Sequence, residues 1–200
     1  MRRASGYDMT VLILGLLVFL GVHSTRIIAD DWRTAQMKRL GEGPWKGIYA
    51  LLSLAGFGVI IWGFGLARQQ PVVLWMPPAG MRHVAGLLTL IAFVLLAAAY
   101  VPRNAIKASV HHPMLLAVKV WAFAHLLSNG KLADLVLFGA FLGWAVVCFI
   151  AARKRDRAAG TQYPAGTPGG TTATVIVGAA AWAGFAFWLH GTLIGVRPFG

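Results

Sequence analysis

Residues 110 to 130 form an apolar stretch that carries three histidines and one lysine, VHHPMLLAVKVWAFAHLLSNG. Ionisable side chains are costly inside a lipid bilayer, so those found in a membrane-spanning helix are read as functional by default. The functional site of the chain is therefore expected in this segment, and the other predicted helices must position its side chains.

The shortage of carboxylates excludes several kinds of site. The chain has six acidic residues, of which Glu42 is the one glutamate, so it cannot build a di-iron bundle that takes a glutamate from each of four helices. It also lacks the H-E-x-x-H, G-x-S-x-G, Walker and dinucleotide motifs. Cys148 is the single cysteine, which excludes an internal disulfide, and no C-x-x-C-H is present for covalent haem.

Histidines in apolar helices with cations near the helix ends favour haem, which needs neutral imidazole on its iron and positive charge near its propionates. Histidine-bound copper is the weaker alternative. His112 and His125 are 13 residues apart, about 20 Å along a helix, and point to nearly opposite faces, so they cannot readily bind one haem together. His23 and His112 are both predicted near the cytoplasmic side, and are the pair that geometry permits most easily. His83, His125 and His190 belong to the outer half of the predicted bundle.

Basic residues near the two predicted ligands could hold the propionates. Arg26 lies one turn beyond His23, and Arg103 and Lys107 come just before His112. Lys119 lies two helical turns after His112 on the same face of the predicted helix. There its ammonium group could pair with a buried anion, border a polar cavity or extend to the interface. The helix-end histidines best explained as interfacial polar residues are His83 and His111.

Composition places these residues in a membrane protein. Of the 200 residues 58% are apolar and 12% are charged, half the charged fraction of a typical soluble domain. The 18 lysines and arginines lie in short tracts between apolar runs. That pattern is typical of juxtamembrane loops and argues against a nucleic-acid partner. Membrane lipid is the expected surrounding.

The apolar runs predict an all-α, polytopic integral membrane bundle of about six transmembrane helices in a single domain, residues 1–200. The runs at 47–66, 84–101 and 133–152 are each close to the ~20 residues that a span requires, and the run at 113–128 is shorter. Arg2 and Arg3 precede the first run without a small-x-small cleavage site after it, so the first helix is expected to be retained. Residues 31–40 could form a short amphipathic helix at the interface, and residues 156–172 read as a flexible loop. The predicted helices are 7–29, 47–66, 84–101, 113–128, 133–152 and 173–195.

Positive charge orients the predicted bundle. The loops after the first, third and fifth helices carry eleven lysines and arginines, and the opposite side carries six. The positive-inside rule then makes the first set cytoplasmic and both termini periplasmic.

Five stretches together resemble the NnrU family of bacterial membrane proteins, whose distant relatives include the ζ-carotene isomerases of plants and cyanobacteria. The stretch from 112 to 130 is the most specific, with its HPML, K-x-W and HLL-x-NG elements. Two positions depart from the family pattern, His111 before the H-P pair and Lys131 after Asn129-Gly130. The matching pieces are GVHSTR (21–26), LGEGPWKGIYALLSLAGFGVIIWGFG (40–65), HPMLLAVKVWAFAHLLSNG (112–130), LFGAFLGWAV (137–146) and LHGTLIGVRPF (189–199).

The resemblance implies a bacterial inner-membrane protein linked to denitrification and nitric oxide metabolism. Its isomerase relatives bind haem b through histidines, which implies His23 and His112 as axial ligands here, with His125 and His190 as second choices. The expected function is thus a haem b protein in nitric oxide-linked redox metabolism. The alternatives are a haem-dependent cis-trans isomerase of a lipophilic polyene and a cofactor-free assembly or transport module. The expected partners, besides lipid, are nitric oxide or a lipophilic small molecule.

Overall fold

The computed structural model describes residues 6–199, and within this range the ordered elements are helices without a strand. Arg2 and Arg3 lie outside the described residues. The elements are α1 (Gly6–Ile28), α2 (Asp30–Leu40), α3 (Glu42–Ala67), α4 (Met81–Tyr100), α5 (Ala105–Val110), α6 (Pro113–Ser128), α7 (Leu132–Ala159), α8 (Pro168–Gly184), the π-helix η1 (Phe185–Leu189) and α9 (His190–Ile194).

The predicted all-α membrane architecture is confirmed. Five segments among the described residues are long and apolar enough to cross a bilayer: α1 from Met9, α3, α4, α7, and the continuous run from α8 to α9. The helix α6 is apolar but has 16 residues, about 24 Å, which is shorter than the ~30 Å hydrocarbon core. The predicted number of six spans is therefore approximate.

The predicted loop at 156–172 is shorter in the structure. The helix α7 continues to Ala159 and α8 begins at Pro168, so the connection between them is residues 160–167. Arginine, lysine and alanine are strong helix formers, so α7 continues past the apolar limit that predicted its end at residue 152. The start of α8 is fixed by Thr167, whose hydroxyl accepts from the Gly170 N–H at 3.1 Å, and by proline in its first turn.

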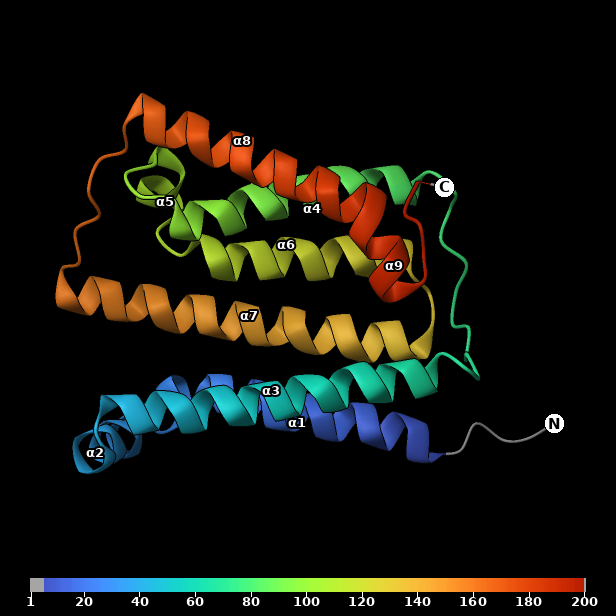
Figure 1. The fold of residues 1–200 in the computed structure, drawn as a ribbon, viewed down its shortest axis with the longest axis horizontal. Coiled ribbons are helices and arrows are strands. Elements are labelled where there is room, and N and C mark those ends of the chain that lie inside the picture. Colours follow the sequence, from blue (N-terminus) through green and yellow to red (C-terminus); the bar gives the residue numbers. More distant parts are fainter. Residues whose placement is uncertain (1–5, 200) are drawn as a thin grey trace. The chain divides into compact units, whose positions relative to one another are not determined.

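The described chain divides into two compact units. The first comprises residues up to Trp75 together with Lys131–Ala140, and so contains α1, α2, α3 and the first turns of α7. Figure 1 shows α1 and α3 side by side and antiparallel. Glycines allow this close approach: a Cβ on Gly15 would lie 2.7 Å from the Ile60 nitrogen, and one on Gly56 2.9 Å from the Phe19 nitrogen. Small residues that let helix backbones approach are a usual device of membrane packing.

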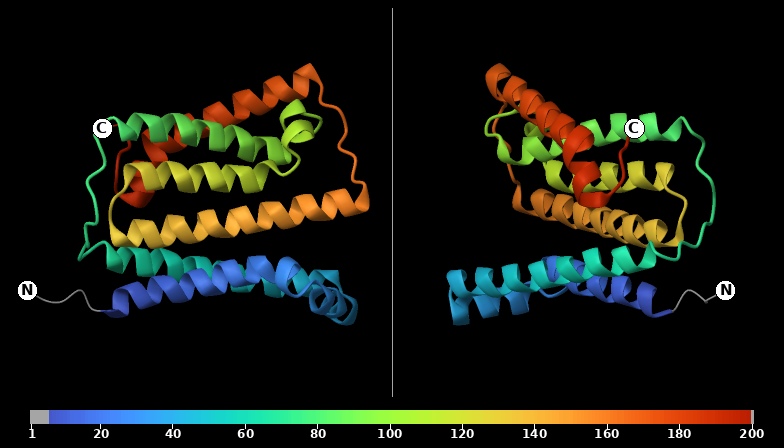
Figure 2. Two further views of the ribbon diagram at one scale, coloured as in Figure 1. Left: turned by 180° about the vertical axis from the view of Figure 1, so that it is seen from behind. Right: turned by 45° about the vertical axis from the view of Figure 1, so that its right-hand side comes forward.

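The second unit comprises Met76–Gly130 and Phe141–Gly200, and α4 is its centre, packed against both α6 and α8 (Figure 2). The α4–α8 contact is close at Gly178, where a Cβ would lie 2.5 Å from the Val94 Cα. Trp182 donates its indole N–H to the Thr89 hydroxyl at 3.1 Å, which satisfies a polar group between the same two helices.

A π-helix interrupts the last span. Residues Phe185–Leu189 form η1, and α9 follows with His190 as its first residue. The chain then turns back at Gly195, which has φ +76°, and brings Phe199 over Gly86 of α4. π-helices are rare, occur mostly as single turns within α-helices, and are frequent at functional sites.

Candidate functional site

His23, in the last turns of α1, lies in an aromatic setting in the first unit. Its Nδ1 is 2.7 Å from the Phe19 carbonyl oxygen one turn earlier. The imidazole stacks on the Phe19 ring at 4.2 Å and meets the Tyr49 ring of α3 edge-on at 5.3 Å. A ring nitrogen next to a carbonyl oxygen must carry the hydrogen, so Nδ1 donates and the neutral ring has its lone pair on Nε2. A backbone carbonyl commonly orients metal-binding histidines in this way.

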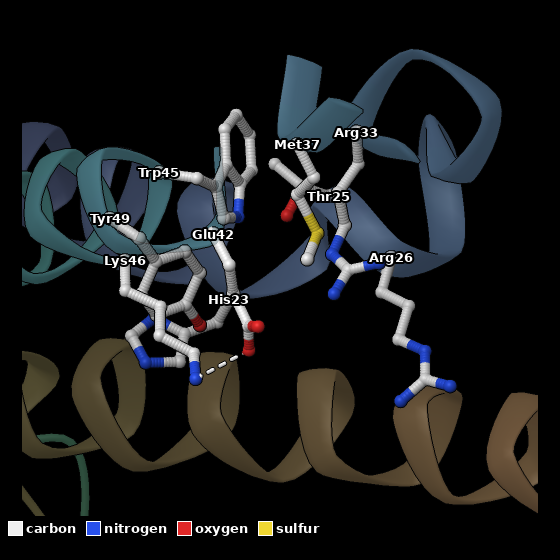
Figure 3. Close-up of a pocket in the computed structure, with 9 residues that line it drawn as sticks. All are labelled: His23, Thr25, Arg26, Arg33, Met37, Glu42, Trp45, Lys46 and Tyr49. Carbon is white, nitrogen blue, oxygen red and sulfur yellow. Dashed lines mark ion pairs between the residues drawn. The ribbon is translucent and has the colours of Figure 1, made fainter. Parts of the chain in front are cut away.

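An open pocket of about 350 Å³ lies beside His23 (Figure 3). Three of its lining residues are cations from three different helices: Arg26 of α1, Arg33 of α2 and Lys46 of α3. Lys46 also pairs with Glu42 at 2.7 Å, and both side chains are largely exposed. The full lining is His23, Thr25, Arg26, Arg33, Met37, Glu42, Trp45, Lys46 and Tyr49.

The pocket thus combines one oriented imidazole, three cations and apolar walls from Met37, Trp45 and Tyr49. Such a lining suits an amphiphilic ligand with anionic groups. The sequence predicted His23 and Arg26 here, and the prediction of a helix at 31–40 is confirmed by α2. The sequence analysis did not predict that Arg33 and Met37 of this helix line the pocket. The basic and aromatic residues on either side of Gly41 were the sequence feature that could have indicated it.

His112, in the second unit, has a different environment. It is the N-cap residue of α6, and its Nε2 is 2.7 Å from Oδ2 of Asp156 near the end of α7. Tyr163, in the 160–167 connection, donates its hydroxyl to the same carboxylate oxygen at 2.8 Å. The pKa of Tyr163 is raised to about 12, first by burial and then by its hydrogen bond and proximity to Asp156. Asp156 and Tyr163 were not predicted as site residues, because they lie in a segment whose composition resembled a linker.

His111 occupies a strained backbone conformation next to His112. It has φ +66° and ψ −48°, and the His112 N–H donates to the Val110 carbonyl at 2.8 Å, which closes a classic γ-turn. A conformation of this kind costs on the order of 1–3 kcal/mol and is often found at functional sites. The His111 ring stacks on Tyr163 at 4.3 Å, and the Arg153 guanidinium donates to its Nδ1.

The remaining predicted cations lie around this second unit. Lys119 places its ammonium group 4.7 Å from the centre of the Phe149 ring, a cation–π contact. Lys107 donates to the Ala99 carbonyl at 3.1 Å, so it stabilises the end of α4. The side chain of Arg103 is exposed, and its backbone carbonyl accepts from Thr167.

The other three histidines gather at the opposite end of the second unit. His125 gives Nδ1–H to the Trp121 carbonyl at 2.8 Å and interacts electrostatically with His190. His190 gives Nδ1–H to the Val196 carbonyl at 2.6 Å, and His83 stacks on Phe199. Within the second unit, His112 therefore lies at one end, and His83, His125 and His190 lie at the other.

The predicted site residues belong to two different units. His23 and Arg26 belong to the first unit, and all other predicted site residues belong to the second. Within the described range, no three histidine, cysteine or acidic side chains converge as a metal site. The pairing of His23 with His112 on one iron stays a prediction.

The fold and these sites define a multi-pass, all-helical membrane protein with oriented histidines at its helix ends. A family model described as NnrU protein matches residues 11–198, and the chain belongs to the NnrU family. No curated protein and no solved structure matches the chain.

Proposed function

We propose that this protein binds haem b in the pocket beside His23, with Nε2 of His23 as an iron ligand. The observation that carries the proposal is the combination of an imidazole whose Nδ1–H is held by the Phe19 carbonyl with a pocket lined by three cations. Haem needs a neutral imidazole for its iron and cations for its propionates, and this donor set fits both needs.

Each part of the lining has a role in this proposal. Arg26, Arg33 and Lys46 would hold the propionates by charge-assisted hydrogen bonds. Trp45 and Tyr49 would cover apolar surface of the ligand and exclude water from it. When bound, haem would supply one-electron and nitric oxide chemistry.

His112 is left out of the proposed ligand set. Its Nε2 is engaged by Asp156, so it would have to offer Nδ1 to an iron or release the carboxylate. In His125 and His190 it is Nδ1 that donates to a backbone carbonyl, so the neutral ring has its lone pair on Nε2; these two stay the second-choice iron ligands that the sequence predicts.

The cellular role that we propose is nitric oxide-linked redox metabolism in the bacterial inner membrane, with the termini periplasmic. Membership of the NnrU family supports this role, together with the multi-pass helices and the excess of basic residues in alternate loops.

The test is the absorption spectrum of the full chain, purified in detergent from haem-replete cells. We expect a Soret band that is lost in His23→Ala and retained in His83→Ala, a matched change of an exposed histidine. A colourless wild-type preparation overturns the proposal. For a coloured protein, a spectral shift of the reduced form with nitric oxide supports the redox role, whereas conversion of a cis polyene without that shift replaces it with an isomerase.

A further inference from the structure

The network around His112 is a built polar site that the haem proposal does not use. Oδ2 of Asp156 is 2.7 Å from Nε2 of His112 and 2.8 Å from the Tyr163 hydroxyl. The side chains of His112 and Asp156 are 21% and 17% exposed, so the pair is mostly covered yet reachable. Three separate segments supply it: the start of α6, the end of α7 and the 160–167 connection.

The carboxylate fixes which nitrogen of His112 can receive a hydrogen bond. A nitrogen beside a carboxylate carries hydrogen, so the neutral ring has its lone pair on Nδ1. This arrangement is the reverse of His23, His125 and His190, which donate from Nδ1 to backbone carbonyls. In those three rings the lone pair is on Nε2, whereas in neutral His112 it is on Nδ1, which can accept a hydrogen bond.

The ring is also held in place by aromatic neighbours. Phe149 of α7 and Tyr163 meet the His112 ring edge-on, at centroid distances of 6.1 Å and 6.2 Å. Lys119 lies over the Phe149 ring, and Arg153 contacts His111. The acceptor therefore has aromatic surface beside it and cations close by, which would favour partial negative charge on a bound oxygen.

We propose that this site binds the head group of a lipid-soluble phenol or hydroquinone, whose O–H donates to Nδ1 of His112. Asp156 acts as a positioning residue that fixes the tautomer, and Tyr163 holds Asp156. The aromatic rings contact the ring of the ligand, and its apolar tail extends along the lipid-exposed helices. The residues of this site all belong to the second unit, and the proposal does not depend on haem binding.

The test compares decylhydroquinone with decylquinone, which has the same tail but no O–H to donate. Binding to the full chain in detergent is measured by titration calorimetry without oxygen, with protein-free micelles as the blank. Because the hydroquinone makes one additional hydrogen bond, we expect it to bind about fivefold tighter, which corresponds to about 1 kcal/mol.

Variants test whether the preference for decylhydroquinone over decylquinone arises at His112. His112→Phe keeps a ring but removes the acceptor, so the preference should vanish; His112 makes no side-chain cap bond to α6 that this change would remove. Should that variant fail to fold, Asp156→Asn frees the tautomer and should at least halve the preference. His83→Phe, at the other end of the unit, should leave the preference unchanged. Equal binding of the two probes by the wild type, or an unchanged preference in both site variants, overturns the proposal.

Discussion

Replacing Asp156 by asparagine should lower the pKa of Tyr163. A titration of Tyr163 therefore tests its hydrogen bond to Asp156, the residue that also contacts His112. The pKa of Tyr163 is raised to about 12 by burial and by the hydrogen bond to the Asp156 carboxylate. An ordinary tyrosine titrates near pH ~10. At pH 11, about one wild-type Tyr163 in ten would therefore be ionised, against about nine in ten for an ordinary tyrosine.

Asparagine removes the charge but leaves the burial, so the Tyr163 pKa in Asp156→Asn should fall between these two values. The assay is tyrosinate absorbance near 295 nm from pH 8 to 12.5, with the Tyr163→Phe curve subtracted to remove the other three of the four tyrosines. Because the folded-state pKa is raised, the protonated hydroxyl stabilises the fold below about pH 10, and this contribution is lost as the pH rises toward 12. The reasoning is refuted if the midpoint of Tyr163 in wild-type protein is near 10, or if it does not move in Asp156→Asn.

Three further substitutions and one matched control test the packing. Asn104→Ala should lower the free energy of unfolding by about 2–4 kcal/mol in a detergent melt. This side chain is 2% exposed; its oxygen accepts from the Lys107 N–H, and its amide donates to two carbonyls at the end of α4. A loss below about 0.5 kcal/mol would contradict this. Gly56→Ala should cost about 1–3 kcal/mol because its Cβ would lie 2.9 Å from backbone of α1. Gly58→Ala, which meets open space in the same helix, is its control and should be neutral or stabilising. Trp182→Phe should cost about 0.6 kcal/mol by the same melt, the usual value of one hydrogen bond within a membrane, and an unchanged melt would show that this bond contributes nothing.

Hydropathy was sufficient to predict the membrane architecture, because lipid selects long apolar runs whatever their packing. It misjudged the ends of helices, because the boundary of an apolar run is not the boundary of a helix. The arginine-rich end of α7 remains helical to Ala159, and capping by Thr167 rather than hydropathy decides where α8 begins.

The candidate sites were predictable in part. Histidines in apolar segments are conspicuous, so the sequence names His23 and His112 as candidates, and helical rise alone separates His112 from His125. The partners were not, because they depend on which segments meet in space. Asp156 and Tyr163 are 44 and 51 residues beyond His112, and neither periodicity nor a local motif connects a linker-like tyrosine to an imidazole at the start of α6.

The π-helix at Phe185–Leu189 marks the place where the last span holds one additional residue. A π-helix contains one residue more than an α-helix would need over the same length. Deleting one residue within it would let the hydrogen bonds return to the α pattern, while the helix beyond keeps its orientation. His190 with its bond to Val196, and Phe199 over Gly86, would then keep their places. A related chain can therefore gain or lose the π-helix through a single codon and retain the histidine end of this unit.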